Sequence, residues 1–157
     1  MNNGIKPRVL LLDDRIVHRD GGVVESKFAA FADRLATQEG FATNAPPAVD
    51  DRGFSLQDAS LDDVATVCRS WIDDFEAGAL VIDMDWWGND EYGEELWKAM
   101  KGDGLAIDPA CVVFLTMFVA PDKRSEIASR NDLSPLQVNY KDTTGYNTAA
   151  KWLVDHL

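Results

Sequence analysis

The chain is poor in the residues that build zinc sites and disulfide frameworks. Its 157 residues include two cysteines, Cys68 and Cys111, and two histidines, His18 and His156. Zinc prefers cysteine and histidine ligands, so no zinc site is expected, and both cysteines should be buried free thiols in a reducing compartment. No run of about 18 apolar residues occurs, so no transmembrane helix is expected. The first residues do not resemble a signal peptide. These absences predict a cytoplasmic protein.

Basic residues are also scarce. Lys and Arg number 15 against 27 Asp and Glu, which gives a formal net charge of -12. Direct nucleic-acid binding and docking to an anionic membrane both need a basic surface, so neither is expected. A chain of this length is typical of one domain, which we expect to span residues 1–157.

Strand and helix patterns alternate along the chain. Five strands are expected, at 8–13, within 41–49, and at 79–83, 111–116 and 136–140. Five helices are expected, at 23–38, from an N-cap at Ser60 to Ala77–Gly78, at 91–101, at 121–130, and from about 144 to the C-terminus, and 50–59 should be a polar loop. Each helix shows apolar residues at spacings of three and four, or is bounded by capping residues.

This order predicts an α/β sandwich with a five-stranded parallel sheet. Strands that alternate with helices pair in parallel, and the nearly continuous apolar runs at 79–83 and 111–116 suit a sheet covered on both faces. Right-handed crossovers leave few topologies. The common one at this size is the flavodoxin-like, doubly wound order 2-1-3-4-5.

Chemically useful side chains end four of the expected strands. They are Asp13 and Asp14, Asp83 and Asp85, Thr116, and Lys141. Ligands bind beyond the carboxyl ends of parallel strands, so we expect these groups to converge. Clustered carboxylates repel each other unless protons or a cation join them, and Mg²⁺ suits oxygen ligands. A carboxylate nucleophile, a cation, a lysine and a hydroxyl together match the needs of phosphoryl transfer. Each residue alone has an ordinary explanation, as a turn, a helix cap or a solvated loop.

Taken together, residues 8–157 resemble the receiver domain of two-component response regulators. The family carries an acidic pair after strand one, a phosphoacceptor aspartate after strand three, a Thr or Ser after strand four and a lysine after strand five. Asp13 and Asp14, Thr116 and Lys141 match, and Gly93 resembles the glycine that opens the third helix.

The resemblance implies a function. A histidine kinase or phosphotransfer protein would donate the phosphoryl group in a Mg²⁺-dependent phosphorelay, and Thr116 and Lys141 would hold its oxygens. Asp14 would bind Mg²⁺ directly and Asp13 through water, with Asp83 and Asp85 completing the metal site. Output would pass to a downstream protein target, and a homodimer is left open. Self-dephosphorylation would be the only further reaction, so the chain would be a signalling domain and not an enzyme.

The identity of the phosphoacceptor is ambiguous. Counting back from Gly93 with the usual family spacing reaches Asp85, whereas the apolar strand itself ends at Asp83. If Asp85 were the acceptor, Asp83 would lie in the buried strand, where an ionisable group is costly. If Asp83 is the acceptor, the following loop is two residues longer than usual, which loops tolerate. We therefore predict Asp83 as the phosphoacceptor, with Asp85 as the alternative. With Asp83 as the acceptor, the backbone carbonyl of Asp85 would face Mg²⁺.

Several departures from the family pattern keep other functions open. Asp142 replaces the proline that usually follows the lysine, Val138 replaces the usual switch aromatic, and the segments 15–22 and 43–60 are long. A degenerate receiver acting as a scaffold would explain these changes. A Mg²⁺-dependent phosphohydrolase is a third hypothesis, because Asp-x-Asp after a strand resembles haloacid-dehalogenase-like enzymes.

Two tryptophans lie directly after the acidic residues. Trp86 and Trp87 should pack partly buried at the rim, or else gate the pocket or contact a partner.

Overall fold

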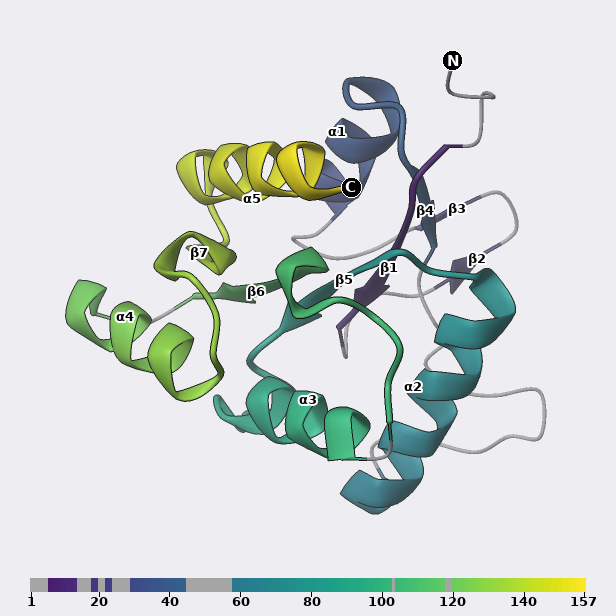
Figure 1. The fold of residues 1–157 in the computed structure, drawn as a ribbon, viewed down its shortest axis with the longest axis vertical. Helices are drawn as coiled ribbons and strands as arrows, with labels where there is room; N and C mark the ends of the chain where they lie inside the picture. The colour runs from purple at the N-terminus through teal and green to yellow at the C-terminus, as the bar shows by residue number, and fades with distance from the viewer. Residues whose placement is uncertain are drawn as a thin grey trace.

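Five parallel strands form the central sheet of the computed structural model (Figure 1). The structure describes residues 6–13, 18–19, 22–23, 29–44, 58–102, 104–117 and 120–157. The strands are β1 (Arg8–Leu12), β4 (Ala42–Asn44), β5 (Ala79–Asp83), β6 (Val112–Thr116) and β7 (Val138–Tyr140). They are arranged as β4-β1-β5-β6-β7, with every neighbouring pair parallel. The predicted order 2-1-3-4-5 of a flavodoxin-like sheet is therefore confirmed.

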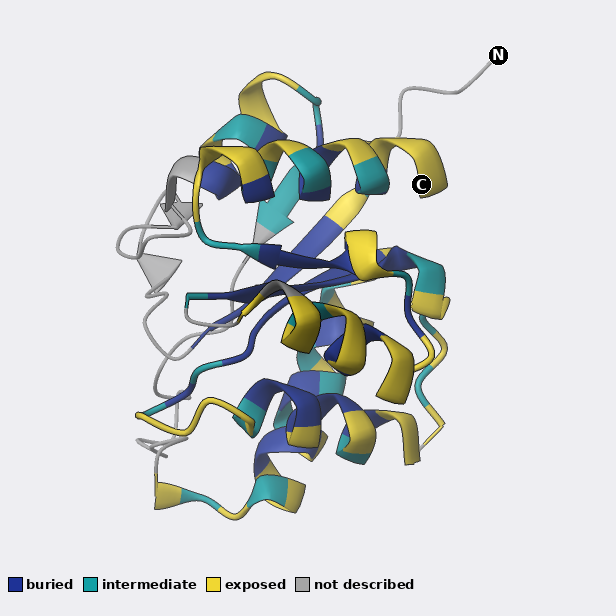
Figure 2. Cartoon of the chain, turned by 90° about the vertical axis from the view of Figure 1, so that its left-hand side faces the viewer, coloured by how far each residue is buried: buried dark blue, intermediate teal, exposed yellow. Residues whose placement is uncertain are grey.

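Helices cover both faces of this sheet. Helices α1 (Ala29–Thr37) and α5 (Thr143–His156) lie on one face, and α2 (Leu61–Phe75), α3 (Tyr92–Gly102) and α4 (Pro121–Arg130) lie on the other (Figures 1 and 2). Successive side chains of a strand point to opposite faces. Leu10 and Leu12 accordingly join the core beneath α2 and α3, while Val9 and Leu11 join the core beneath α1 and α5. The sheet is buried on both sides, as its apolar strands predict.

Local capping explains where several helices begin. The Ser60 hydroxyl accepts a hydrogen bond from the N–H of Asp63 at 3.2 Å, which confirms the predicted cap of α2. The carboxylate of Asp142 accepts one from the N–H of Gly145 at 2.7 Å and caps α5. The cap at Asp142 starts α5 shortly after the end of β7 at Tyr140.

Some predicted boundaries were wrong. The first helix was expected from residue 23, but Gly22–Val23 forms β3, which pairs antiparallel with β2 (His18–Arg19). Residues 24–28 and 50–57 lie outside the described part of the chain. Two expected strand starts are 3₁₀ turns instead, η2 (Pro109–Cys111) and η3 (Pro135–Gln137). Each turn has a proline after a capping side chain, which favours a helical turn.

The sequence predicted two buried free cysteines and no transmembrane helix. Cys68 and Cys111 are free and buried. Among the described residues, no helix is both long and apolar enough to cross a membrane.

Candidate functional site

The carboxyl ends of three adjacent strands meet through main-chain hydrogen bonds. The N–H of Met84, just after β5, donates to the carbonyl of Leu115 at 3.0 Å. The N–H of Lys141, just after β7, donates to the carbonyl of Thr116 at 2.9 Å. These bonds extend the sheet ladder beyond the named strands. Asp83, Thr116 and Lys141 are therefore held on neighbouring strand ends, as the sequence predicted.

A buried ion pair lies at the centre of this edge. The Lys141 Nζ is 2.7 Å from Oδ1 of Asp83, and the two side chains are 7% and 1% exposed. The same Oδ1 accepts a hydrogen bond from the backbone N–H of Asp85 at 3.1 Å. Asp83 is thus the carboxylate that the lysine contacts, and Asp85 contributes its main chain to the arrangement.

The charge on Asp83 depends on these partners. Burial is the largest influence and raises the pKa of Asp83. The positive charge and hydrogen bond of Lys141 oppose that rise, as do a hydrogen bond to the Asp13 side chain and the Asp85 N–H. The net pKa is raised. Neighbouring carboxyl groups need a proton or a nearby cation, and the Lys141 ammonium is one such cation at this edge.

The other predicted site residues are only partly described. Asp13 is buried and lies against Asp83, and Thr116 is 5% exposed at the end of β6. Asp85 is half-buried. Asp14, the predicted direct Mg²⁺ ligand, lies outside the described residues. Within the described part of the chain, no group of three or more Asp, Glu, His or Cys side chains is arranged to hold a metal ion.

Gly93 allows α3 to begin against the end of β5. A Cβ at this position would lie 2.2 Å from the carbonyl oxygen of Asp83 and 2.7 Å from the Cα of Met84. The N–H of Gly93 donates to the carbonyl of Met84 at 3.0 Å. Only glycine fits this close approach of two backbones, which gives a physical reason for the glycine expected from the family resemblance.

The two tryptophans after the site differ in exposure. Trp86 is 1% exposed and belongs to the core beneath α2 and α3, so it is more deeply buried than the expected rim packing. Its indole Nε1–H donates to the carbonyl of Asp83 at 2.7 Å. Trp87 is half-buried and packs against this core. Sequence reasoning missed the hydrogen bond, because nothing in the pattern shows where an indole N–H points.

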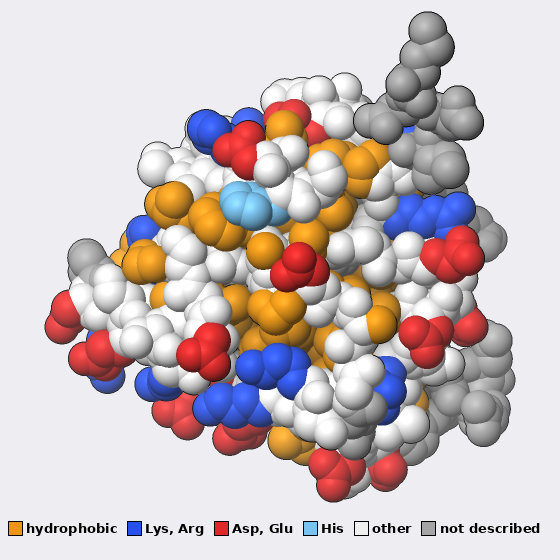
Figure 3. Space-filling view, viewed as in Figure 1, with side chains coloured by type: hydrophobic (Ala, Val, Ile, Leu, Met, Phe, Trp, Pro, Cys, Tyr) orange, Lys and Arg blue, Asp and Glu red, His pale blue; other side chains and the backbone are white. Residues whose placement is uncertain are grey.

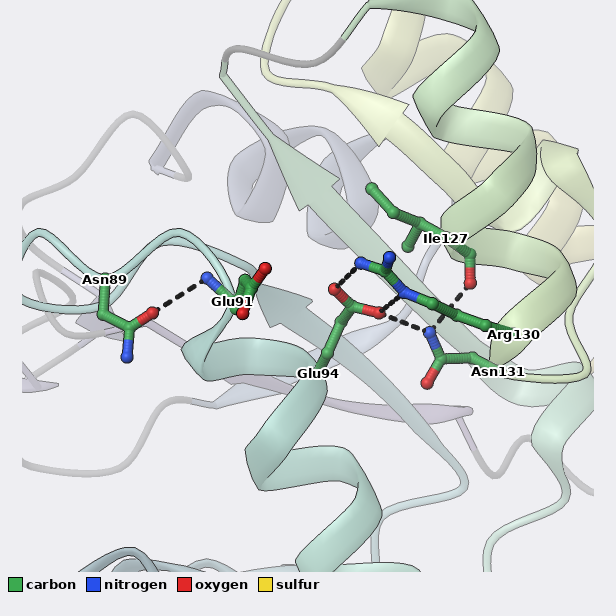
Figure 4. Close-up of polar contacts among 6 residues, drawn as sticks. All are labelled: Asn89, Glu91, Glu94, Ile127, Arg130 and Asn131. Atoms are coloured by element: carbon green, nitrogen blue, oxygen red, sulfur yellow. Dashed lines mark hydrogen bonds and ion pairs between the residues drawn. The ribbon is translucent and has the colours of Figure 1, made fainter.

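A second polar cluster links α3 to α4 and was not predicted (Figure 4). Glu94 is 3% exposed and accepts hydrogen bonds from Nε and Nη2 of Arg130 and from Nδ2 of Asn131. Burial is the largest influence on the pKa of Glu94 and raises it, but these bonds and the Arg130 charge outweigh burial and lower the pKa overall. Glu94 and Arg130 also line a cavity of about 290 Å³ that reaches Met84, one residue beyond Asp83.

Surface charge on one face is mixed. Figure 3 shows basic side chains singly or in small groups among acidic ones, around an area of hydrophobic side chains. Among the residues coloured there, no continuous basic stripe is visible.

Comparison with known proteins identifies the fold. No family model matches the chain, and no curated protein matches its sequence. Among solved structures, the chain is similar to a two-component response regulator of the LuxR family from Aurantimonas sp. SI85-9A1. The identity is 15%, the TM-score is 0.58, and the match covers 97% of this chain and 87% of that one. The flavodoxin-like fold expected from the sequence is therefore confirmed, and it is similar to the fold of this response regulator.

Proposed function

We propose that this chain is a receiver domain that accepts a phosphoryl group on Asp83 from a phosphohistidine of a histidine kinase or phosphotransfer protein. The observation that carries the proposal is the buried pair of Lys141 and Asp83, 2.7 Å apart at the carboxyl edge of the sheet. Thr116 lies buried on the neighbouring strand end. The similarity in fold to a response regulator supports the same function.

The chemistry follows from the groups at this edge. A carboxylate oxygen of Asp83 would attack the phosphorus, forming a P–O bond as the P–N bond to the donor imidazole breaks. The imidazole nitrogen would keep the electron pair and then take a proton. Negative charge on the phosphoryl oxygens needs compensation during this step. The Lys141 ammonium would move from the carboxylate to one oxygen, and the Thr116 hydroxyl would donate to another.

The proposed cofactor of this site is Mg²⁺. Asp13 and Asp83 are buried carboxyls in direct contact, and a hard divalent cation is a natural partner for such a pair. Asp83 and the main-chain carbonyl of Asp85 would contribute oxygen ligands, and Asp13 would bind through water. Asp14, proposed from the sequence alone, would bind directly. When bound, the ion would neutralise charge between the carboxylates and the incoming phosphoryl group.

The proposed role is that of a cytoplasmic signalling domain. Phosphorylation would change the surface near the ends of β6 and β7, and a downstream protein would read that change. Acceptance and self-dephosphorylation would be its only reactions.

The test is intact-protein mass spectrometry after incubation with acetyl phosphate and Mg²⁺. Wild type is expected to gain one phosphoryl adduct that depends on Mg²⁺, and Asp83→Asn is expected to gain none. Asp85→Asn is the matched control and should still be labelled. Loss of labelling in Asp85→Asn alone would move the acceptor to Asp85. No adduct in wild type would refute the proposal and favour a scaffold. Continuous turnover of small phosphate esters would instead favour a phosphohydrolase.

A further inference from the structure

The segment between Asp83 and Gly93 contains a tight hairpin. Trp86 and Asn89 exchange main-chain hydrogen bonds, at 3.1 Å from the Trp86 N–H and 2.9 Å from the Asn89 N–H. Between them, Trp87 has a φ of 51° and Gly88 a φ of 81°. Positive φ at both central residues is typical of a type I′ turn, but it is unusual for a side chain as bulky as tryptophan. Such a conformation persists only where its surroundings hold it, often at functional sites.

Aromatic packing holds this turn. The ring of Trp86 lies 5.4 Å from that of Trp87 and 5.5 Å from that of Tyr92, and Trp87 and Tyr92 are 5.3 Å apart. These separations are within the range of favourable aromatic pairs. Trp86 is fully buried and Tyr92 is the first residue of α3. The hairpin is therefore anchored to the helix that also begins against Asp83.

Two hydrogen bonds connect the hairpin to Asp83. The Trp86 Nε1–H donates to the main-chain carbonyl of Asp83 at 2.7 Å. The N–H of Asp85, immediately before Trp86, donates to the Asp83 carboxylate at 3.1 Å. The first bond fixes the main chain at Asp83, and the second restricts its side chain. Because Asp85 lies between the two anchored residues, movement of Trp86 would also move the N–H that Asp85 presents.

We propose that Trp86 is a positioning residue for Asp83: its indole hydrogen bond sets the orientation of the carboxylate that receives the phosphoryl group. The proposal rests on the proposed function, although the orientation itself does not require phosphorylation. The proposal also explains the length of the loop after Asp83. This loop is two residues longer than is usual in receiver domains, and the added length accommodates the aromatic hairpin. Trp86 acts through Asp83 and does not touch the reacting atoms.

The chain offers a matched control for the indole hydrogen bond. Trp97 belongs to the same core, is 0% exposed, and its Nε1 has no hydrogen-bond partner among the described residues. Both substitutions remove ring area and change an aromatic contact, that of Trp86 with Trp87 and Tyr92 and that of Trp97 with the Lys101 ammonium. Only Trp86→Phe also removes an indole hydrogen bond. At saturating Mg²⁺, Trp86→Phe should gain the acetyl-phosphate adduct roughly three- to tenfold more slowly than wild type, as expected for the loss of one net hydrogen bond. Trp97→Phe should label at the wild-type rate, and equal slowing in both variants would overturn the proposal.

A second measurement separates this proposal from the proposed function. The carboxyl ¹³C resonance of Asp83, assigned by its loss in Asp83→Asn, reports the carboxylate's setting without Mg²⁺ or phosphoryl donor. It should shift in Trp86→Phe and stay in place in Trp97→Phe. A wild type that accepts no phosphoryl group would refute the receiver function while this shift still tests Trp86. An unchanged resonance in Trp86→Phe would overturn the positioning role.

Asp83→Asn provides a test if Trp86→Phe does not fold. The indole N–H resonance of Trp86 should shift in Asp83→Asn, because the indole is bonded to the Asp83 backbone. The indole resonance of Trp97 should stay in place. A Trp86 indole resonance that is unchanged in Asp83→Asn would contradict the proposal.

Discussion

Replacing Lys141 with methionine should destabilise the protein in a way that depends on pH. Methionine keeps most of the apolar stem of lysine but removes the ammonium group 2.7 Å from the Asp83 carboxylate. Asp83 is 1% exposed, so water cannot replace the lost cation. Burial already raises the pKa of Asp83, and Lys141 lowers it in opposition. The substitution should therefore raise this pKa further.

Protonation of Asp83 sets an upper limit on the loss. An ordinary aspartate has a pKa of about 3.9, and protonating it at a higher pH costs about 1.36 kcal/mol for each pH unit above that value. The cost is therefore about 4 kcal/mol at pH 7 and about 1.5 kcal/mol at pH 5. Removing one partner of a buried ion pair typically costs about 3–5 kcal/mol, which is close to the cost of protonating Asp83 at pH 7. Protonation of Asp83 should therefore limit the loss of stability at that pH. In the variant, folded Asp83 holds a proton that the unfolded chain has released, so the free energy of unfolding should fall as pH rises.

Urea denaturation at pH 5, 6 and 7 would measure this effect. Wild type is expected to exceed Lys141→Met in free energy of unfolding by at most about 4 kcal/mol at pH 7, and by clearly less at pH 5. The double variant Lys141→Met with Asp83→Asn lacks the buried carboxyl and should lose this extra pH dependence. A difference between wild type and Lys141→Met that is the same at pH 5 and pH 7 would refute the reasoning.

Two further substitutions test the packing around the site. Gly93→Ala should destabilise the protein by more than about 1 kcal/mol, because its Cβ would lie 2.2 Å from the Asp83 carbonyl oxygen. The control Gly102→Ala lies in the same helix, where a Cβ meets nothing within 4 Å, and it should be neutral or slightly stabilising. Thermal unfolding of the two variants side by side would check this, and equal losses would contradict it. Arg130→Met should cost about 1–3 kcal/mol at pH 7, because it leaves the buried Glu94 carboxylate short of partners. The lowered pKa of Glu94 contributes stability above its unfolded pKa, and this contribution is lost as pH falls. The cost of Arg130→Met in urea denaturation should therefore shrink toward pH 4, and a constant cost would count against the ion pair.

Much of the fold could be predicted because its strands are strongly patterned. The run Ala79–Asp83 is buried along its whole length, and alternation along Arg8–Leu12 divides the side chains between two cores. The boundaries that failed depend on local chemistry instead. Gln137 was expected in a strand, but its side chain accepts from the N–H of Ser134 and completes a capping box. The β2–β3 pair was missed because two-residue strands leave no periodic pattern.

The candidate site was predictable only as far as strand ends determine it. The rule that parallel strands present their carboxyl ends at one edge brought Asp83 and Lys141 together in the sequence, and they lie 2.7 Å apart in the structure. The count from Gly93 points to Asp85 if the loop has the family length, whereas the ion pair with Lys141 involves Asp83. The choice of Asp83 over Asp85 as phosphoacceptor therefore stays a prediction. The Glu94–Arg130 pair could not be predicted, because nothing in a single sequence shows which residues of two helices face each other.

Two residues near Lys141 that depart from the usual receiver pattern have structural roles of their own. Asp142, where the family usually has proline, caps α5 through the N–H of Gly145. A Cβ on Gly145 would lie 1.9 Å from the carbonyl oxygen of Tyr140, so α5 begins in contact with the end of β7. Val138, where the family often has a switch aromatic, is fully buried in the core and leaves no ring to rotate there. The connection that the described residues offer instead runs through Lys141, whose N–H is bonded to Thr116 and whose chain leads directly into α5. A phosphoryl group that draws the Lys141 ammonium away from Asp83 would thus act on a lysine held between β6 and the first turn of α5.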